Sequence, residues 1–168
     1  FSCGVVCLSE PESAAVFRSL AGDSVPCLEG SGGLLRLSEL SDADHVVFAS
    51  SGTAAIPALI RALETGKDVS LANKESILVA APWVLPKVSR KDQIRPLDSE
   101  HNAIWQCLRN ESPESVNRLI LTASGGPFRT YSSEQLSRVT PEDAIRHPVW
   151  SMGTKISVDS ATLMNKGI

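Results

Sequence analysis

The sequence has little excess charge of either sign and no long apolar run, and both absences exclude classes of partner. Its 168 residues contain 16 Lys and Arg against 19 Asp and Glu, for a formal net charge of -3. A protein that binds nucleic acid or an anionic membrane through charge needs a basic field, which this composition does not supply. No apolar stretch approaches the roughly 20 residues of a membrane-spanning helix. We therefore expect neither nucleic acid nor a membrane as a partner.

Cysteine is scarce as well. The four cysteines show neither CxxC spacing nor the density of a disulfide scaffold, and they are Cys3, Cys7, Cys27 and Cys107. Because most of them lie in apolar runs, we predict buried, reduced thiols.

The N-terminal residues show no charged segment followed by an apolar one, so export has no support. We expect the bacterial cytoplasm as the location, with a plastid as the alternative for a protein that has lost its transit peptide. Phe1 stands where Met would start a natural chain, and Lys166, Gly167 and Ile168 fall within a helical pattern. We therefore expect a fragment that is cut at both ends.

Hydrophobic residues make up 42% of the chain and charged residues 21%, as in ordinary globular proteins. Short apolar runs, which predict strands, occur at residues 4–8, 25–28, 45–49, 69–72, 93–97 and 118–123. Helical patterns separate them at residues 11–20 behind a cap at Ser9, 53–65 with Pro57 in the first turns, and 75–85. This alternation predicts an α/β fold with a doubly wound, Rossmann-like parallel sheet.

The strand and helix rhythm ends near Leu97, where we place a domain boundary. Residues 1–97 would form the Rossmann-like domain and residues 98–168 part of an α+β domain. Residues 125–154 are rich in Gly, Pro, Ser and Thr, with one short helical start at Thr140, and a loop of this length is usually functional or mobile. We interpret it as a lid with His147 and Trp150 at its tip, and the alternative for these two residues is an ordinary packing contact within a loop.

The segment Asp98-Ser99-Glu100 is the best candidate for a metal site. If the backbone is extended, residues two apart share a face, and two carboxylates on one face suit Mg²⁺ or Mn²⁺. An Asp-x-Glu at the end of a strand is also the ordinary composition of a helix cap and solvated first turn, so this alternative stays open.

Two segments offer anion sites. Asn73, Lys74 and Glu75 follow a predicted strand and open a helix, where ligands bind in open α/β sheets. In Ser124-Gly125-Gly126-Pro127, the backbone N–H groups of the glycine pair can approach a phosphate. The alternatives are a solvated first helical turn for the lysine and a plain turn for the glycines.

The last segment passes from an alternating run, residues 155–158, into a helix capped near Asp159 or Ser160. Ser160, Asn165 and Lys166 are candidate ligands of one anion, but their spacing brings them together only if the helix bends or ends there. A surface helix with solvated polar residues is the alternative. The glycine-rich Gly30-Ser31-Gly32-Gly33 lacks the spacing of a dinucleotide loop, and we predict a turn.

Taken in order, these motifs are similar to those of the 1-deoxy-D-xylulose 5-phosphate reductoisomerases from about Ala49 to the end. The runs that carry the resemblance are Ala-Ser-Ser-Gly at 49–52, Leu-Ala-Asn-Lys-Glu-Ser at 71–76, Pro-Leu-Asp-Ser-Glu-His-Asn-Ala-Ile at 96–104, Ser-Gly-Gly-Pro-Phe at 124–128, His-Pro at 147–148, Trp-Ser-Met-Gly at 150–153, Lys-Ile-Ser-Val-Asp-Ser-Ala-Thr at 155–162 and Met-Asn-Lys-Gly at 164–167. The first 48 residues fit less distinctively.

The resemblance implies an NADPH-dependent and Mg²⁺- or Mn²⁺-dependent enzyme that converts 1-deoxy-D-xylulose 5-phosphate to 2-C-methyl-D-erythritol 4-phosphate. It implies that Asp98 and Glu100 bind the metal and that Lys74 and Ser99 contact substrate oxygens. It also implies a phosphate site and a cofactor site. The implied phosphate ligands are Ser124, Ser160, Asn165 and Lys166, with His147 closing over them and Trp150 covering the reacting pair, and the implied NADPH contacts are Asn73, Glu75 and Gly153.

By the same resemblance, the protein would be a homodimer whose central region supplies the contact. The glycine-rich phosphate turn, a third metal carboxylate and a helical C-terminal domain would lie outside the chain, so we expect the fragment itself to be inactive. The alternatives are a non-catalytic nucleotide or sugar-phosphate binding module and a fragment that serves only folding or assembly.

Overall fold

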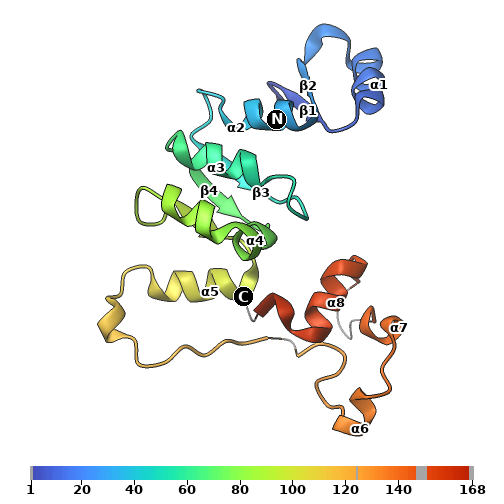
Figure 1. Ribbon diagram of the computed structural model, residues 1–168, viewed down its shortest axis with the longest axis vertical. Coiled ribbons are helices and arrows are strands. Elements are labelled where there is room, and N and C mark those ends of the chain that lie inside the picture. The colour runs from blue at the N-terminus through green and yellow to red at the C-terminus, as the bar shows by residue number, and fades with distance from the viewer. Residues whose placement is uncertain (1, 124, 147–150, 167–168) are drawn as a thin grey trace. The chain divides into compact units, whose positions relative to one another are not determined.

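The computed structural model describes residues 2–123, 125–146 and 151–166, and the chain divides into two compact units, Phe1–Asp98 and Ser99–Ile168 (Figure 1). Within the described residues, no helix has the length and apolar character that crossing a membrane requires.

The first unit is built on short parallel strands. They are β1 (Val6–Leu8), β2 (Cys27–Glu29), β3 (His45–Phe48), β4 (Asp68–Leu71) and β5 (Ile94–Pro96). β1 pairs with β2, while β3, β4 and β5 form a second sheet in that order, and all pairs are parallel. The predicted parallel α/β fold is therefore confirmed, although its described strands form two sheets.

Two helices cover one face of the second sheet and close its core. α3 (Ile56–Glu64) connects β3 to β4, and α4 (Glu75–Val84) connects β4 to β5 (Figure 1). Because the strands are in sequential order, right-handed crossovers bring both helices to the same face. Leu59 and Leu63 of α3 and Val84 of α4 pack with Val69 of β4 and are almost fully buried.

The helices of the first sheet differ in part from the predictions. α1 (Pro11–Ala21) begins after Glu10 with no side-chain cap, so the predicted cap at Ser9 is wrong. The predicted turn at residues 30–33 is also wrong, because these residues open α2 (Gly30–Ser38). A Cβ at Gly33 would lie 2.8 Å from the Cys7 sulfur, so glycine permits this close approach of α2 to β1.

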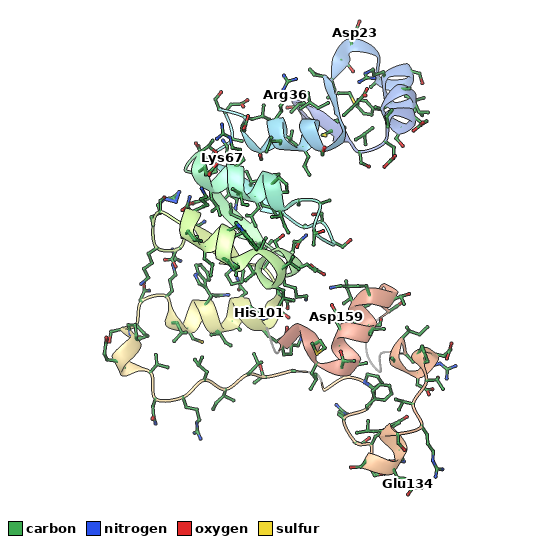
Figure 2. The ribbon with its side chains drawn as sticks, in the orientation of Figure 1. Asp23, Arg36, Lys67, His101, Glu134 and Asp159 are labelled. Carbon is green, nitrogen blue, oxygen red and sulfur yellow. The ribbon has the colours of Figure 1, made fainter. Side chains whose placement is uncertain are left out.

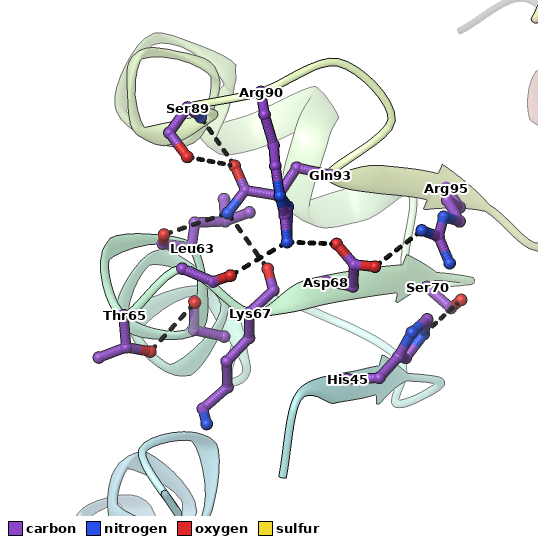
Figure 3. Close-up of polar contacts among 12 residues, drawn as sticks. His45, Leu63, Thr65, Lys67, Asp68, Ser70, Ser89, Arg90, Gln93 and Arg95 are labelled. Atoms are coloured by element: carbon purple, nitrogen blue, oxygen red, sulfur yellow. Dashed lines mark hydrogen bonds and ion pairs between the residues drawn. The ribbon is translucent and has the colours of Figure 1, made fainter.

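A buried amide fixes the entry to β5 (Figure 3). Gln93 has no exposed surface; its Oε1 accepts from the backbone N–H and hydroxyl of Ser89, and its Nε2 donates to the carbonyls of Leu63 and Lys67. Because all its polar groups are paired, it connects α3 and β4 to the start of β5 at low desolvation cost. The strand that leads to Asp98 is thereby held in register.

The second unit is helical in its described residues. Its elements are α5 (Ser99–Leu108), η3 (Pro113–Ser115), α6 (Ser133–Leu136), α7 (Pro141–Ala144), α8 (Thr154–Thr162) and η4 (Met164–Lys166). Capping boxes at Ser132 and Thr140 start α6 and α7. The predicted helical start at Thr140 is confirmed.

The strand predicted at residues 118–123 is wrong. These residues carry no strand assignment, and Leu119 and Ile120 are 57% and 70% exposed. A strand needs a neighbour that takes up its backbone hydrogen bonds, and no described segment of this unit provides one.

The prediction for the cysteines is correct in one respect. All four are free thiols, but Cys3 and Cys107 are exposed and Cys7 and Cys27 are half-buried. Burial, with a smaller contribution from Cys27, raises the pKa of the Cys7 thiol, which favours the protonated form.

Candidate functional site

The carboxyl edge of the second sheet brings together Lys74 and Asp98, two of the candidate site residues. The backbone N–H of Leu97 donates to the carbonyl of Leu71 at 2.9 Å, so the pairing of β4 with β5 continues to the point where both strands end. Lys74 precedes α4 directly and Asp98 follows β5 by two residues. Carboxyl ends of neighbouring parallel strands lie side by side, which places these side chains within reach of each other.

Lys74 and Asp98 form an ion pair. The lysine Nζ lies 2.5 Å from Oδ2 of the aspartate, and the two side chains are only 19% and 17% exposed. The contact joins the predicted substrate lysine to one of the predicted metal carboxylates.

Asn73 holds the two loops of this edge together. Its side chain is 1% exposed, and Nδ2 donates to the carbonyls of Ser50 and Gly52, each at 2.8 Å. Its Oδ1 accepts from the backbone N–H and hydroxyl of Ser76 in the first turn of α4. The amide is thus engaged within the chain, so any contact that Asn73 makes with a cofactor would come from its backbone.

A second lysine and carboxylate pair lies in the second unit. Nζ of Lys166 is 2.8 Å from Oε2 of Glu100, and the side chains are 11% and 16% exposed. The hydroxyl of Ser99 donates to the same carboxylate oxygen at 2.9 Å. Glu100 lies in the first turn of α5, where the helix dipole favours a negative charge.

Lys166 reaches Glu100 because α8 ends early. Leu163 adopts a left-handed conformation with φ 56° at the C-cap, and η4 then carries Lys166 away from the helix axis. The bend that the spacing required is therefore present. The predicted cap near Asp159 or Ser160 is wrong, because α8 starts after Gly153 and Asp159 lies within the helix (Figure 2). Asp159 is paired there with Lys155 at 2.6 Å.

Gly126 packs directly against α8. Its φ is +64°, and a Cβ there would lie 2.8 Å from the carbonyl oxygen of Ser160 and 3.0 Å from Cα of Ala161. Ser160 is buried at this contact. The glycine pair therefore sets how closely its turn approaches the helix that carries a predicted phosphate ligand.

The remaining candidates are distributed over both units. Glu75 is the first residue of α4 and Gly153 is the N-cap of α8. The predictions for Ser124, His147 and Trp150 lie outside the described residues, as does the side chain of Asn165.

The extended geometry that we predicted for Asp98 and Glu100 is wrong. Asp98 directly precedes α5 and Glu100 is its second residue, so the open alternative of a helix start describes the backbone better. No group of three or more His, Cys, Asp or Glu side chains among the described residues is arranged to hold a metal ion. Two carboxylates still fit Mg²⁺ or Mn²⁺ in their donor chemistry, since Mg²⁺ is usually held by one or two carboxylates together with water and substrate oxygens.

The roles of Asn73 and Gly126 as packing and connecting residues were not apparent in the sequence. An Asn directly after a strand and before a helix is a signal for a local hydrogen-bond connector. A glycine pair signals positive φ, but not which backbone will approach it.

Comparison with known proteins decides the family. A family model described as 1-deoxy-D-xylulose 5-phosphate reductoisomerase matches residues 1–81, and the model of the C-terminal domain of that enzyme matches residues 94–168. The chain belongs to the 1-deoxy-D-xylulose 5-phosphate reductoisomerase family. The resemblance that we noted in the motifs is thereby confirmed.

Curated family members are similar over nearly the whole chain. The reductoisomerase of Chloroherpeton thalassium is 45% identical over 166 residues, which are 98% of this chain and 43% of that protein. The reductoisomerase of Prosthecochloris aestuarii is 46% identical over 100% of this chain and 44% of its own length. The chain thus spans less than half the length of these relatives.

Solved structures agree with the fold. The reductoisomerase of Zymomonas mobilis in complex with NADPH aligns with a TM-score of 0.83 at 39% identity, over 98% of this chain and 42% of that one. A reductoisomerase in complex with NADPH, fosmidomycin and magnesium aligns with a TM-score of 0.79 at 37% identity, over 97% and 43%.

Proposed function

We propose that the full-length protein is an NADPH- and divalent-metal-dependent reductoisomerase that converts 1-deoxy-D-xylulose 5-phosphate to 2-C-methyl-D-erythritol 4-phosphate. The observation that carries the proposal is the ion pair of Lys74 with Asp98 at the carboxyl edge of a parallel sheet, in a chain whose family matches cover residues 1–81 and 94–168.

Asp98 and Glu100 are the proposed metal ligands. Both are hard oxygen donors, and both side chains are largely withdrawn from solvent, at 17% and 16% exposure. A bound Mg²⁺ or Mn²⁺ would act as a Lewis acid on the ketone and hydroxyl oxygens of the substrate. Lys74 and Ser99 would orient those oxygens by hydrogen bonds.

The domain assignment follows the proposal. Residues 1–97 would form part of the NADPH-binding domain and residues 98–168 part of the catalytic domain. Asn73, through its backbone, and Glu75 and Gly153 would contact NADPH, and the bound cofactor would supply the hydride for the reduction. The similarity to a reductoisomerase in complex with NADPH supports this assignment.

The phosphate would be the anchor of the substrate. Ser124, Ser160, Asn165 and Lys166 are the proposed ligands, with His147 closing over the phosphate and Trp150 covering the reacting pair. Binding energy from this non-reacting group can order the segment 125–154 as a lid and exclude water, which raises the rate of the chemical step. The packing of Gly126 against the carbonyl of Ser160 supports a role for the glycine turn in positioning the substrate phosphate.

We also propose that the full-length protein is a homodimer. Exposed Leu119 and Ile120 on an unpaired segment of the second unit are consistent with a further contact surface in the complete chain. Light scattering coupled to size-exclusion chromatography would return twice the chain mass if this is correct.

NADPH oxidation tests the proposed activity. The full-length protein, supplied with 1-deoxy-D-xylulose 5-phosphate and Mg²⁺ or Mn²⁺, is expected to oxidise NADPH, and omission of the metal should abolish the reaction. Asp98→Asn should reduce kcat/KM by at least about 100-fold, since changes outside the ligand shell of a metal already cost 10–100-fold. Asp159→Asn, which removes an equal charge from α8, is the matched control and should change it little. NADPH oxidation that does not depend on the metal would contradict the proposal, and so would the absence of NADPH oxidation by a folded, metal-loaded protein.

A further inference from the structure

Each of the two proposed metal carboxylates is already held by a lysine. Asp98 is paired with Lys74 at 2.5 Å in the first unit, and Glu100 is paired with Lys166 at 2.8 Å in the second. Both lysines are candidate substrate ligands. The same four side chains therefore account for the proposed metal site and for part of the proposed substrate site.

These pairs differ from an ordinary surface ion pair. In the Lys155–Asp159 pair on α8 the lysine side chain is 53% exposed, whereas Lys74 and Lys166 are 19% and 11% exposed. An exposed pair contributes little, because water screens it. A carboxylate withdrawn from water needs a compensating positive charge, and here the lysine supplies it.

We propose that Lys74 and Lys166 act as internal counter-ions in the metal-free protein, and that a divalent cation displaces them and releases them for the substrate. The inference rests on the proposed function and adds to it a coupling between metal binding and substrate binding. An ammonium on a flexible stem is a compact charge that can change partner without moving the backbone.

The charges support this exchange. Before the metal binds, two carboxylates and two ammonium groups sum to zero. A divalent cation that takes over one of these carboxylates leaves the lysine ammonium group that was paired with it without a counter-charge. A phosphate monoester carries about −1.5 to −2 at neutral pH, so a substrate phosphate would restore the balance. Metal binding thus frees Lys166 for the substrate phosphate and Lys74 for the other substrate oxygens, and by linkage the substrate strengthens metal binding by the same factor.

Lysine acetylation of the full-length protein tests the exchange directly. Brief treatment with an N-hydroxysuccinimide ester, without substrate and with or without saturating Mg²⁺, is followed by mass spectrometry of each lysine. Labelling of Lys74 and Lys166 should rise about threefold or more when Mg²⁺ is present, as each ammonium leaves a partly buried ion pair. Labelling of Lys155 is the internal reference and should not change.

Calorimetric titration with Mn²⁺ gives an independent result. Lys74→Met removes the internal competitor, so the metal should bind about threefold to tenfold more tightly than to the wild-type protein. Lys155→Met removes an equal charge from α8 and should change the affinity by less than about twofold. If Lys74 instead serves to position Asp98, the affinity of Lys74→Met will fall.

The outcomes separate the inference from the proposed function. Metal binding without a change in the labelling of Lys74 and Lys166 would overturn the inference and leave the proposed function standing. Absence of metal binding by the wild-type protein would overturn both. If Lys74→Met does not fold, the labelling of the wild-type protein decides alone.

Discussion

Gly126→Ala should loosen the contact between the glycine turn and α8. At φ +64° an alanine costs roughly 1 kcal/mol or more relative to glycine. Its Cβ would also lie 2.8 Å from the Ser160 carbonyl oxygen and 3.0 Å from Cα of Ala161, both of them backbone atoms that cannot rotate away. Such overpacking typically costs about 1–3 kcal/mol, so the total loss should be about 2–4 kcal/mol.

Hydrogen exchange of the α8 amides in the full-length protein would measure this loss locally. Since each 1.4 kcal/mol is a factor of ten, the exchange rate in Gly126→Ala should rise about 30-fold or more, unless it reaches the rate of unprotected amides. The KM for the sugar phosphate should rise too if Ser160 holds the phosphate. Gly66→Ala is the matched control, because its φ is +79° and nothing lies within 4 Å of the added Cβ. Unchanged exchange of α8 in Gly126→Ala would refute the argument.

Three further predictions concern side chains whose hydrogen bonds hold a loop, a strand or a helix start in place. Gln93→Leu leaves the hydrogen-bond partners at Ser89, Leu63 and Lys67 unpaired, and it should lower the free energy of unfolding by about 3 kcal/mol. Urea titration measures this loss. Gln106 is exposed, so Gln106→Leu is the control and should change the free energy of unfolding by less than about 0.5 kcal/mol. Asn73→Ala should release the loop at Ser50 and weaken NADPH binding about tenfold, which corresponds to about 1.4 kcal/mol of binding free energy. Fluorescence titration with NADPH measures this affinity, and an unchanged affinity would contradict the prediction. The backbone N–H of Thr140, and then its hydroxyl, lower the pKa of Asp143. The Asp143 carboxylate therefore stabilises α7 fully above the ordinary aspartate pKa of about 4, and this stabilisation is lost as the pH falls through the lowered pKa of Asp143. Hydrogen exchange of α7 should show that loss in the wild-type protein and not in Asp143→Asn.

The parallel strands of the first unit were predictable because each overlaps one of the short apolar runs at residues 4–8, 25–28, 45–49, 69–72 and 93–97. Val69 and Leu71 lie on β4 where the apolar pattern placed a strand. The run at residues 118–123 has a similar composition, yet it forms no strand. The composition of a segment shows that it can form a β-strand. Whether it does so depends on a neighbouring strand to pair with, and the local sequence pattern does not reveal that neighbour.

The chemistry of the candidate site was more predictable than its geometry. The residue types at Lys74, Asp98, Glu100 and Lys166 marked them as candidates before any contact was known. Their pairing was not predictable, because it depends on the continuation of β5 to Leu97 and on the left-handed turn at Leu163. A non-glycine residue with positive φ has no strong local signal in the sequence.

The most direct test of the proposed function is the carbon skeleton of the product. The full-length protein is incubated with ¹³C-labelled 1-deoxy-D-xylulose 5-phosphate, NADPH and Mg²⁺, and the product is examined by NMR. The proposal predicts a branched polyol phosphate, one molecule for each NADPH oxidised. An unbranched product formed with NADPH oxidation would show a simple reductase, and the absence of turnover by a folded, metal-loaded protein would contradict the assignment of an enzyme.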